Sequence, residues 1–193
     1  MRVLETEAVL LAALAGPAAG WAAEIEAPAA CPADGPASAA QVDRYDALIL
    51  RHAQEHGLNP RLVKAVVATE SQFFPGAVSP AGARGLMQLM PATSREMGVP
   101  AWNRSDPDAN IGAGTKYLAR LFQAARRRGE PRGAASARTL RLVVAAYHDG
   151  PRALHSARWT ASTRRYVRTV LSCYRSRTSV LRETRPLQLY AAL

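Results

Sequence analysis

The chain has 193 residues, 48% of them hydrophobic, which is enough for one domain with a core of ordinary size. Lys and Arg number 25 against 15 Asp and Glu, so the net charge is +10 and an anionic partner is expected. No arginine run is interleaved with aromatic residues as a base-stacking groove requires, which argues against a nucleic-acid partner.

The N-terminal 41 residues are expected to precede the packed domain. After Arg2, an apolar run over residues 8–19 is too short to span a bilayer but suits the core of a signal peptide. Glu5 and Glu7 depart from a positive leader, so residues 1–23 are predicted to be a signal peptide or a retained membrane anchor. Residues 24–41, rich in Ala, Pro and Gly, are predicted to be a linker. An exported, periplasmic protein is the expectation.

Two cysteines are present, Cys31 in this linker and Cys173 on the last strong helix. An even pair in an exported chain can form a disulfide, which would tie the linker to the domain. The alternative is two free thiols, one loose and one buried.

A packed catalytic domain is predicted for residues 42–176, beginning with two helices. Asp43 can cap the first helix, which Gly57 ends. Asn59 followed by Pro60 starts the second, whose apolar stripe includes Val66 and Val67. Glu70 falls on that same stripe, three and four residues further on.

The rest of the domain is also predicted to be helical. An irregular loop over residues 73–85 is followed by helices over residues 91–98, 108–128, 136–147 and 162–174. No segment alternates convincingly with period two, so the fold class is all-α, with little or no sheet. Residues 177–193 are predicted to be a basic C-terminal tail.

Glu70 is the candidate catalytic residue. Placing a carboxylate on an apolar helix face disfavours its charged form, which raises the pKa and creates a general acid. Cleavage of a glycosidic bond requires such an acid to protonate the leaving oxygen. The alternative from position alone is a glutamate at a frayed, solvated helix end.

The residues around Glu70 resemble the soluble lytic transglycosylases of glycoside hydrolase family 23. The similarity covers roughly residues 46–170, in the family's order and spacing. The matching segments are Ala68–Ser79, Gly82–Pro91, Asp108–Ile111, Gly114, Tyr117–Leu118, Ala146–Pro151 and Thr163–Val167.

This resemblance implies a lysozyme-like fold and a reaction on peptidoglycan glycan strands. A single glutamate, here Glu70, protonates the oxygen between N-acetylmuramic acid and N-acetylglucosamine. It then acts as a base on the muramyl C6 hydroxyl, giving a 1,6-anhydro sugar. The resemblance implies no cofactor and no metal. The protein is expected to be a monomer, and small members of the family often serve a secretion or conjugation apparatus.

The resemblance also implies a set of substrate-binding residues. Ser79 is expected to contact the reacting sugar or Glu70, and Tyr147 to hydrogen-bond Glu70. Gln88 and Met90 are expected to line the cleft. The full implied set is Ser79, Gln88, Met90, Tyr117, Ala146, Tyr147, His148 and Tyr166.

Three positions depart from the family's pattern. His148 and Asp149 stand where the family usually has Asn-Ala, and Ser162 stands where it usually has a glutamate. The first change replaces an amide with a ring that titrates near pH 6 to 7. We therefore hypothesise that His148 makes the activity sensitive to pH.

A zinc site is a competing interpretation. His52, Glu55 and His56 match the H-x-x-E-H pattern of inverted-motif metalloproteases, with two imidazoles one helical turn apart. Gly57 ends the helix directly afterwards and no convincing third ligand follows. The pattern is therefore interpreted as coincidental.

Two other functions remain as alternatives. A wall-binding component of a secretion or conjugation apparatus could keep the fold without turnover, as the changes at His148 and Ser162 suggest. A hydrolytic enzyme like the goose-type lysozymes would share the fold and differ in its product, which would carry a reducing end.

Overall fold

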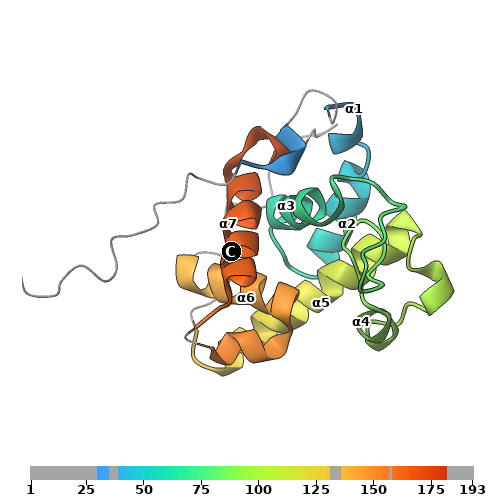
Figure 1. Ribbon diagram of the computed structural model, residues 1–193. Coiled ribbons are helices and arrows are strands. Elements are labelled where there is room, and N and C mark those ends of the chain that lie inside the picture. The colour runs from blue at the N-terminus through green and yellow to red at the C-terminus, as the bar shows by residue number, and fades with distance from the viewer. Residues whose placement is uncertain (1–29, 35–38, 131–135, 157, 182–193) are drawn as a thin grey trace, which may run out of the picture.

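The structure is a computed structural model that describes residues 30–34, 39–130, 136–156 and 158–181 (Figure 1). No β-strand occurs in these ranges, and the only β pairing within them consists of two isolated bridges, Val78 with Arg84 and Arg84 with Leu89. The all-α prediction is confirmed. None of the helices described is long and apolar enough to cross a bilayer. In chain order the elements are η1 (Pro32–Asp34), α1 (Ala39–Val42), α2 (Asp46–Glu55), α3 (Pro60–Ser71), α4 (Pro91–Glu96), η3 (Ala101–Asn103), α5 (Pro107–Arg127), α6 (Ala137–Asp149), η4 (Pro151–His155), α7 (Ala161–Arg175) and η5 (Arg177–Ser179).

Polar caps define where most of the long helices begin. The side chain of Asn59 accepts a hydrogen bond from the backbone N–H of Arg61, and Pro60 occupies the first turn of α3. Asp106, Ser136 and Thr160 cap α5, α6 and α7 in the same way. These caps satisfy backbone donors that have no partner within the helix.

The start of α2 differs from the prediction. The helix begins at Asp46, and Asp43 does not cap it. The Asp43 carboxylate instead lies 3.1 Å from the ammonium group of Lys64. A buried ammonium needs carboxylate partners, and this requirement outweighs local capping.

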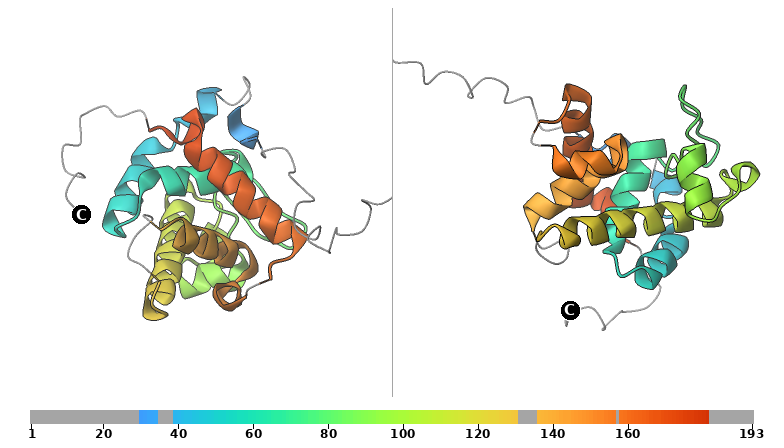
Figure 2. Two further views of the ribbon diagram at one scale, coloured as in Figure 1. Left: turned by 90° about the vertical axis from the view of Figure 1, so that its left-hand side faces the viewer. Right: turned by 90° about the horizontal axis from the view of Figure 1, so that it is seen from below.

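Helix α3 forms the centre of the fold (Figure 1). Its residues from Leu62 to Ala68 are all buried, and it packs against α2, α7 and η5. The longest described helix, α5, packs against α2 on one side and α6 on the other, as the views in Figure 2 show. Glu70 therefore lies at the end of the most enclosed helix.

The packed domain extends beyond both predicted boundaries. Cys31 and Ala33, expected in a linker, are buried in the core, and η1 contacts α3 and α7. A disulfide joins Cys31 to Cys173 of α7 and fixes this segment in place. At the other end, Ser179 of the expected tail is fully buried. The predicted signal peptide or anchor, residues 1–23, lies outside the described residues, as does most of the basic tail.

Lys64 explains why the C-terminal segment packs. Its side chain has no exposed surface, and its ammonium lies 2.7 Å from Asp46 and donates a 3.0 Å hydrogen bond to the carbonyl of Val180. Nearby, Arg61 donates to Ser179 Oγ at 3.1 Å. The segment that was predicted to be a tail therefore supplies hydrogen-bond acceptors for Arg61 and Lys64 of α3.

Candidate active site

Glu70 lies in the last turn of α3, where a sharp change of backbone direction ends the helix. Gln72 and Phe73 both have positive φ, 51° and 65°, a conformation that L-residues rarely adopt. The buried ring of Phe73 and a 2.8 Å hydrogen bond from Ser71 Oγ to the Leu86 carbonyl hold this turn. The turn leaves the Glu70 side chain partly open to solvent while protein surrounds most of it.

Tyr166 of α7 is the hydrogen-bond partner of Glu70. Its hydroxyl donates to Glu70 Oε1 at 2.6 Å. The expectation that Tyr147 would fill this role is wrong, since the Tyr147 hydroxyl donates to the Met87 carbonyl at 2.9 Å. The two tyrosines have different hydrogen-bond partners. Helix α7, which carries Tyr166, packs closely against α3, whereas Tyr147 on α6 reaches the loop before α4.

The surroundings of Glu70 favour its neutral form. Burial raises the pKa of Glu70 from 4.5 to about 7, although the hydrogen bond from Tyr166 opposes this shift. Burial, and then the nearby Glu70 charge, raise the pKa of Tyr147 and of Tyr166 well above the usual value, so both phenols remain protonated. Glu70 can therefore both donate and accept a proton near neutral pH.

His148 contacts Tyr166, the hydrogen-bond partner of Glu70, through a ring stack. Its imidazole lies 4.5 Å from the ring of Tyr166 at an interplanar angle of 16°. His148 Nε2 is 3.8 Å from Asp149 Oδ1, and the hydroxyl of Thr163 donates to Asp149 Oδ2. The departures at His148 and Asp149 thus lie in one contact chain that joins the end of α6 to the start of α7.

Ser162, the third departure, takes part in the cap of α7. Its Oγ lies 2.8 Å from Thr160 Oγ1, and Thr160 caps the helix by accepting from Thr163 N–H. Ser162 is exposed, and its side chain bonds Thr160 and not Glu70. Its position near the start of α7 leaves the hydrogen bond between Tyr166 and Glu70 intact.

A tightly held loop, residues 77–90, faces the end of α3. Asn110 of α5 accepts from Met87 N–H at 2.7 Å and donates to the Arg84 carbonyl at 2.9 Å. The buried guanidinium of Arg104 donates to the carbonyls of Gly82 and Leu89 at 2.9 and 3.1 Å. These two side chains fix the loop against α5.

Sequence reasoning did not identify Ser71, Arg104 or Asn110 as residues that shape the site. A polar Asn110 on the buried face of α5, next to Ile111, is the signal that could have found one of them. Arg104 carried no such signal, because it lies in a turn where an exposed arginine is the ordinary expectation.

The predicted cleft residues have mixed surroundings. Ser79 Oγ accepts a 3.0 Å hydrogen bond from Ala83 N–H and makes none with Glu70. Gln88, at φ 48°, donates its amide to the carbonyls of Ala77 and Gly85, so it stabilises the loop. Met90 is 41% exposed and suits a contact surface, whereas Ala146 has no exposed surface and its side chain packs in the core.

Tyr117 completes an aromatic cluster near the site. Its ring centroid lies 5.5 Å from that of Tyr147, and the rings are tilted by 52°. Tyr117 is only partly buried. Together Tyr117, Tyr147 and Tyr166 bring side chains from α5, α6 and α7 toward the end of α3.

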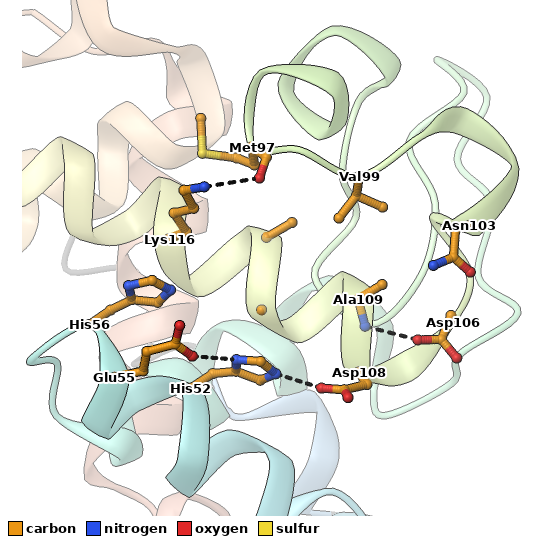
Figure 3. A pocket seen from close by; sticks show the side chains of 12 residues that line it. His52, Glu55, His56, Met97, Val99, Asn103, Asp106, Asp108, Ala109 and Lys116 are labelled. Atoms are coloured by element: carbon orange, nitrogen blue, oxygen red, sulfur yellow. Dashed lines mark hydrogen bonds and ion pairs between the residues drawn. The ribbon is translucent and has the colours of Figure 1, made fainter.

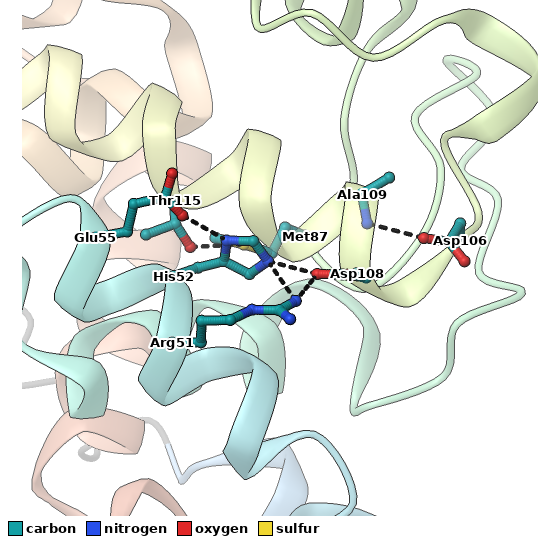
Figure 4. A network of polar contacts seen from close by, with 8 residues as sticks. All are labelled: Arg51, His52, Glu55, Met87, Asp106, Asp108, Ala109 and Thr115. Carbon is teal, nitrogen blue, oxygen red and sulfur yellow. Dashed lines mark hydrogen bonds and ion pairs between the residues drawn. The ribbon is translucent and has the colours of Figure 1, made fainter.

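The H-x-x-E-H residues lie elsewhere, beside a separate cavity of about 460 Å³ (Figure 3). His52 Nε2 lies 2.6 Å from Asp108 Oδ1, its Nδ1 is 3.4 Å from Glu55, and Arg51 also pairs with Asp108 (Figure 4). In the described part of the chain, no three His, Cys, Asp or Glu side chains are placed to hold a metal ion. His52 and its partners join α2 to α5.

Comparisons with known proteins identify the family of the chain. The model of the family described as the transglycosylase SLT domain matches residues 47–168. A membrane-bound lytic murein transglycosylase F from Desulfosudis oleivorans is 43% identical over 81 residues, 42% of this chain and 17% of the relative. A transglycosylase of Enterobacteria phage PRD1 is 39% identical over 112 residues, 58% of this chain and 36% of the relative.

Solved structures give the same result for the fold. The lytic transglycosylase Slt of Pseudomonas aeruginosa, an inactive mutant, matches with a TM-score of 0.55 and 30% identity over 68% of this chain and 23% of its own. The 70 kDa soluble lytic transglycosylase of Escherichia coli matches with a TM-score of 0.57 and 27% identity over 67% of this chain and 23% of its own. The matched part of the chain covers between 17% and 36% of the length of these four proteins.

Proposed function

The chain belongs to the transglycosylase SLT domain family, and from this premise we propose that it cleaves peptidoglycan as a lytic transglycosylase with Glu70 as its catalytic residue. The proposed bond is the β-1,4 bond between N-acetylmuramic acid and N-acetylglucosamine. The proposed product is 1,6-anhydro-N-acetylmuramic acid. The relatives' names describe the same class of enzyme.

The proposed reaction uses one carboxyl group twice. Protonated Glu70 gives its proton to the glycosidic oxygen, the bond from that oxygen to muramyl C1 breaks, and N-acetylglucosamine leaves with a new 4-hydroxyl. The Glu70 carboxylate then removes the proton of the muramyl C6 hydroxyl as this oxygen bonds to C1. Glu70 ends the cycle protonated and no water is consumed. Holding the C6 hydroxyl beside C1 makes the second step intramolecular, which favours it entropically.

The observation that carries this proposal is the single, neutralised carboxyl group of Glu70. Burial raises its pKa to about 7, and Tyr166 orients it through a 2.6 Å hydrogen bond. No second carboxylate among the described residues hydrogen-bonds Glu70 or contributes to its pKa shift. One group poised near neutrality is what an acid that later becomes a base requires.

We also propose that the protein works in an exported, periplasmic setting. The disulfide between Cys31 and Cys173 supports this, since such bonds persist mainly in oxidising compartments. A secretion or conjugation apparatus as partner stays a prediction.

Digestion of purified peptidoglycan tests the proposed activity. We expect muropeptides lighter by one water than hydrolytic products, released by the wild-type protein and absent with Glu70→Gln. The matched control is Glu96→Gln, which alters an exposed glutamate that pairs with Arg120 and should keep full activity. Products with reducing ends would instead indicate a lysozyme. A folded protein that binds the wall and releases nothing would indicate a wall-binding role.

A further inference from the structure

The positive charge of the chain is concentrated in one part of the domain. Residues 120–168 contain 12 arginines and 2 acidic residues, whereas residues 39–119 contain 8 basic and 7 acidic residues. The first of these segments alone carries a net charge of +10, equal to that of the whole chain. It comprises the end of α5, then α6 and η4, and the start of α7, and the contacts of α6 with α5, η4 and α7 bring these elements together (Figure 1).

Two adjoining hollows on these elements are lined by arginine. The first, of about 680 Å³, lies where the start of α6, the segment after η4 and the start of α7 meet. The second, of about 800 Å³, lies at the end of α5. The hollows adjoin because Arg138 of the first donates to Glu130 of the second at 3.2 Å. We call the two hollows together the arginine face, and its arginines are Arg126, Arg127, Arg138, Arg141, Arg158 and Arg164.

Little negative charge offsets the arginine face. Among the residues that line it, Glu130 alone is acidic, and its carboxylate is 17% exposed and engaged by Arg138. The exposed guanidinium groups of Arg126, Arg127, Arg141 and Arg158 have no hydrogen-bond or ion-pair partner within the described residues. Planar guanidinium groups match the oxygens of a phosphate in pairs, so the face suits a ligand that presents several phosphates.

The arginine face also offers apolar surface. Leu142 and Trp159 line the first hollow among its arginines, and both side chains are partly buried. Tryptophan is enriched where water meets lipid, because its ring has an apolar body and a polar edge. Phosphates with apolar groups just behind them are the chemistry of a phospholipid surface.

Two observations favour a lipid surface over a nucleic acid. Trp159 is the one aromatic residue that lines the arginine face, so bases would find a single stacking platform there. The disulfide between Cys31 and Cys173 is typical of oxidising compartments, which membranes enclose.

From these observations we propose that the arginine face docks on a membrane surface and that its guanidinium groups bind the phosphates of anionic phospholipids. The proposal goes beyond the reaction at Glu70 and does not depend on it, because none of the residues that line the two hollows belongs to the candidate active site. Docking of this kind is peripheral, through charge at the level of the headgroups. It holds the domain at the membrane.

Vesicle binding by the full chain tests this inference. The face variant carries Arg141→Gln and Arg158→Gln, two exposed side chains whose replacement breaks no contact within the described residues. The matched control carries Arg44→Gln and Arg95→Gln, two exposed arginines outside the face. The vesicles contain either equal parts of phosphatidylglycerol and phosphatidylcholine or phosphatidylcholine alone. Every protein keeps residues 1–23, so any contribution of that segment is common to all and cancels in the ratio of Kd values.

We expect the face variant to raise the Kd for the anionic vesicles about 10- to 30-fold at low salt, as the loss of two arginines near an anionic surface implies. The control variant should raise it less than about 3-fold, and all three proteins should bind phosphatidylcholine vesicles alike. An equal loss in the face and control variants would show that only the total charge matters and would overturn the proposal. An unchanged Kd in the face variant would also overturn it.

Three further probes separate a lipid surface from other anions. Inorganic phosphate at fixed ionic strength should leave the protein on the vesicles, and its release would identify free phosphate as the ligand instead. Duplex DNA and purified peptidoglycan are bound in parallel by the same variants. A larger loss for either polymer than for the vesicles would assign the face to that polymer and overturn docking on lipid. Digestion of peptidoglycan in solution, measured without vesicles, tests the proposed function separately.

Discussion

Burial of Glu70 serves its proposed reaction but costs stability. The same burial that raises its pKa also disfavours the charged form of the group in the native state. Below pH 4.5 the group is protonated whether the chain is folded or unfolded. Between pH 4.5 and about 7 the native state holds a proton that the unfolded state has lost. The native state therefore loses stability as pH rises through this range, and the loss stays complete above it.

Replacing Glu70 with Gln should accordingly stabilise the protein at alkaline pH. Because the side chain is partly open to solvent, we expect a gain of about 2 kcal/mol in the free energy of unfolding at pH 8, shrinking to near zero at pH 4. Urea unfolding of both proteins at the two pH values measures this. The same difference at both values would contradict the raised pKa.

His148 should shape the pH dependence of activity. A protonated imidazole would place a cation on the Tyr166 ring and make its hydroxyl a stronger donor to the Glu70 carboxylate. Among the described residues, the Asp149 carboxylate forms an ion pair with His148 at 3.8 Å when the imidazole is protonated. We expect kcat/KM to depend on the charge of this ring as well as on Glu70, and to fall above about pH 7, where Glu70 loses its proton.

His148→Asn should flatten the pH profile near neutrality and leave the fall above about pH 7, which belongs to Glu70. The profile of kcat/KM from pH 5 to 9 on soluble glycan strands measures this. Glu96→Gln serves as the control, because it changes an exposed charge on α4. An unchanged profile in His148→Asn would show that the stack does not influence Glu70.

At this scale the sequence predicted the position of Glu70 but not its partner. The stripe of Val66 and Val67 and the cap at Asn59 were sufficient to place Glu70 on the buried side of α3. Which tyrosine bonds it depends on how α7 crosses α3, and no local pattern encodes that crossing. Tyr166 is buried and Tyr147 is partly buried, both lie near enough to Glu70 for its charge to raise the pKa of their phenols, and only the packing separates their roles.

Among the elements, the loop of residues 77–90 depends on close packing against α5. Gly85 has a φ of +82°, and a Cβ there would lie 2.3 Å from Asn110 Nδ2 and 2.6 Å from the Arg104 carbonyl oxygen. Gly82 in the same loop has a φ of +84° but nothing within 4 Å of such a Cβ. The two glycines share a backbone conformation, and they differ in the room that is available for an added Cβ atom.

Gly85→Ala should therefore cost more stability than Gly82→Ala. We expect a loss of about 2 to 4 kcal/mol for the first, from strain and displacement of Asn110, and about 1 kcal/mol for the second, from backbone strain alone. Urea unfolding measures both. Gly85→Ala should also reduce activity, because Asn110 holds the loop that faces Glu70. Equal losses would mean that Asn110 moves aside freely.

Helix boundaries were predictable where a polar cap or a glycine marked them. The starts of α3 and α6 follow from Asn59 and Ser136, whose side chains accept the expected backbone hydrogen bonds. The start of α2 was not predictable, because Asp43 turns to the buried Lys64. The hydrogen bonds that hold the loop of residues 77–90 were also missed. Arg104 and Asn110 donate them to carbonyl groups about 15 to 26 positions away in the chain.

For the whole molecule, the disulfide between Cys31 and Cys173 closes a loop with a sequence separation of 142 residues. Composition left the pairing open, and the linker-like sequence around Cys31 gave no sign that this segment would be buried. A bond across so long a loop restricts the unfolded chain strongly. The bond therefore favours the folded domain.

Reduction should lower the stability of the protein by about 2 to 5 kcal/mol. The thermal midpoint measured with and without dithiothreitol tests this, with the double variant Cys31→Ser and Cys173→Ser as the control that should not respond. A midpoint that dithiothreitol leaves unchanged in the wild-type protein would show that non-covalent contacts of η1 suffice.

The same bond changes what a protease can do to the domain. Because Cys31 and Cys173 enclose α3 and every residue of the candidate site, this whole region is a covalent ring. A single backbone cut anywhere within the ring opens it without releasing a piece, so the two fragments stay joined until the sulfurs are reduced. The Glu70 region of a nicked molecule would remain tethered to its partner helix α7, in a position to reassemble.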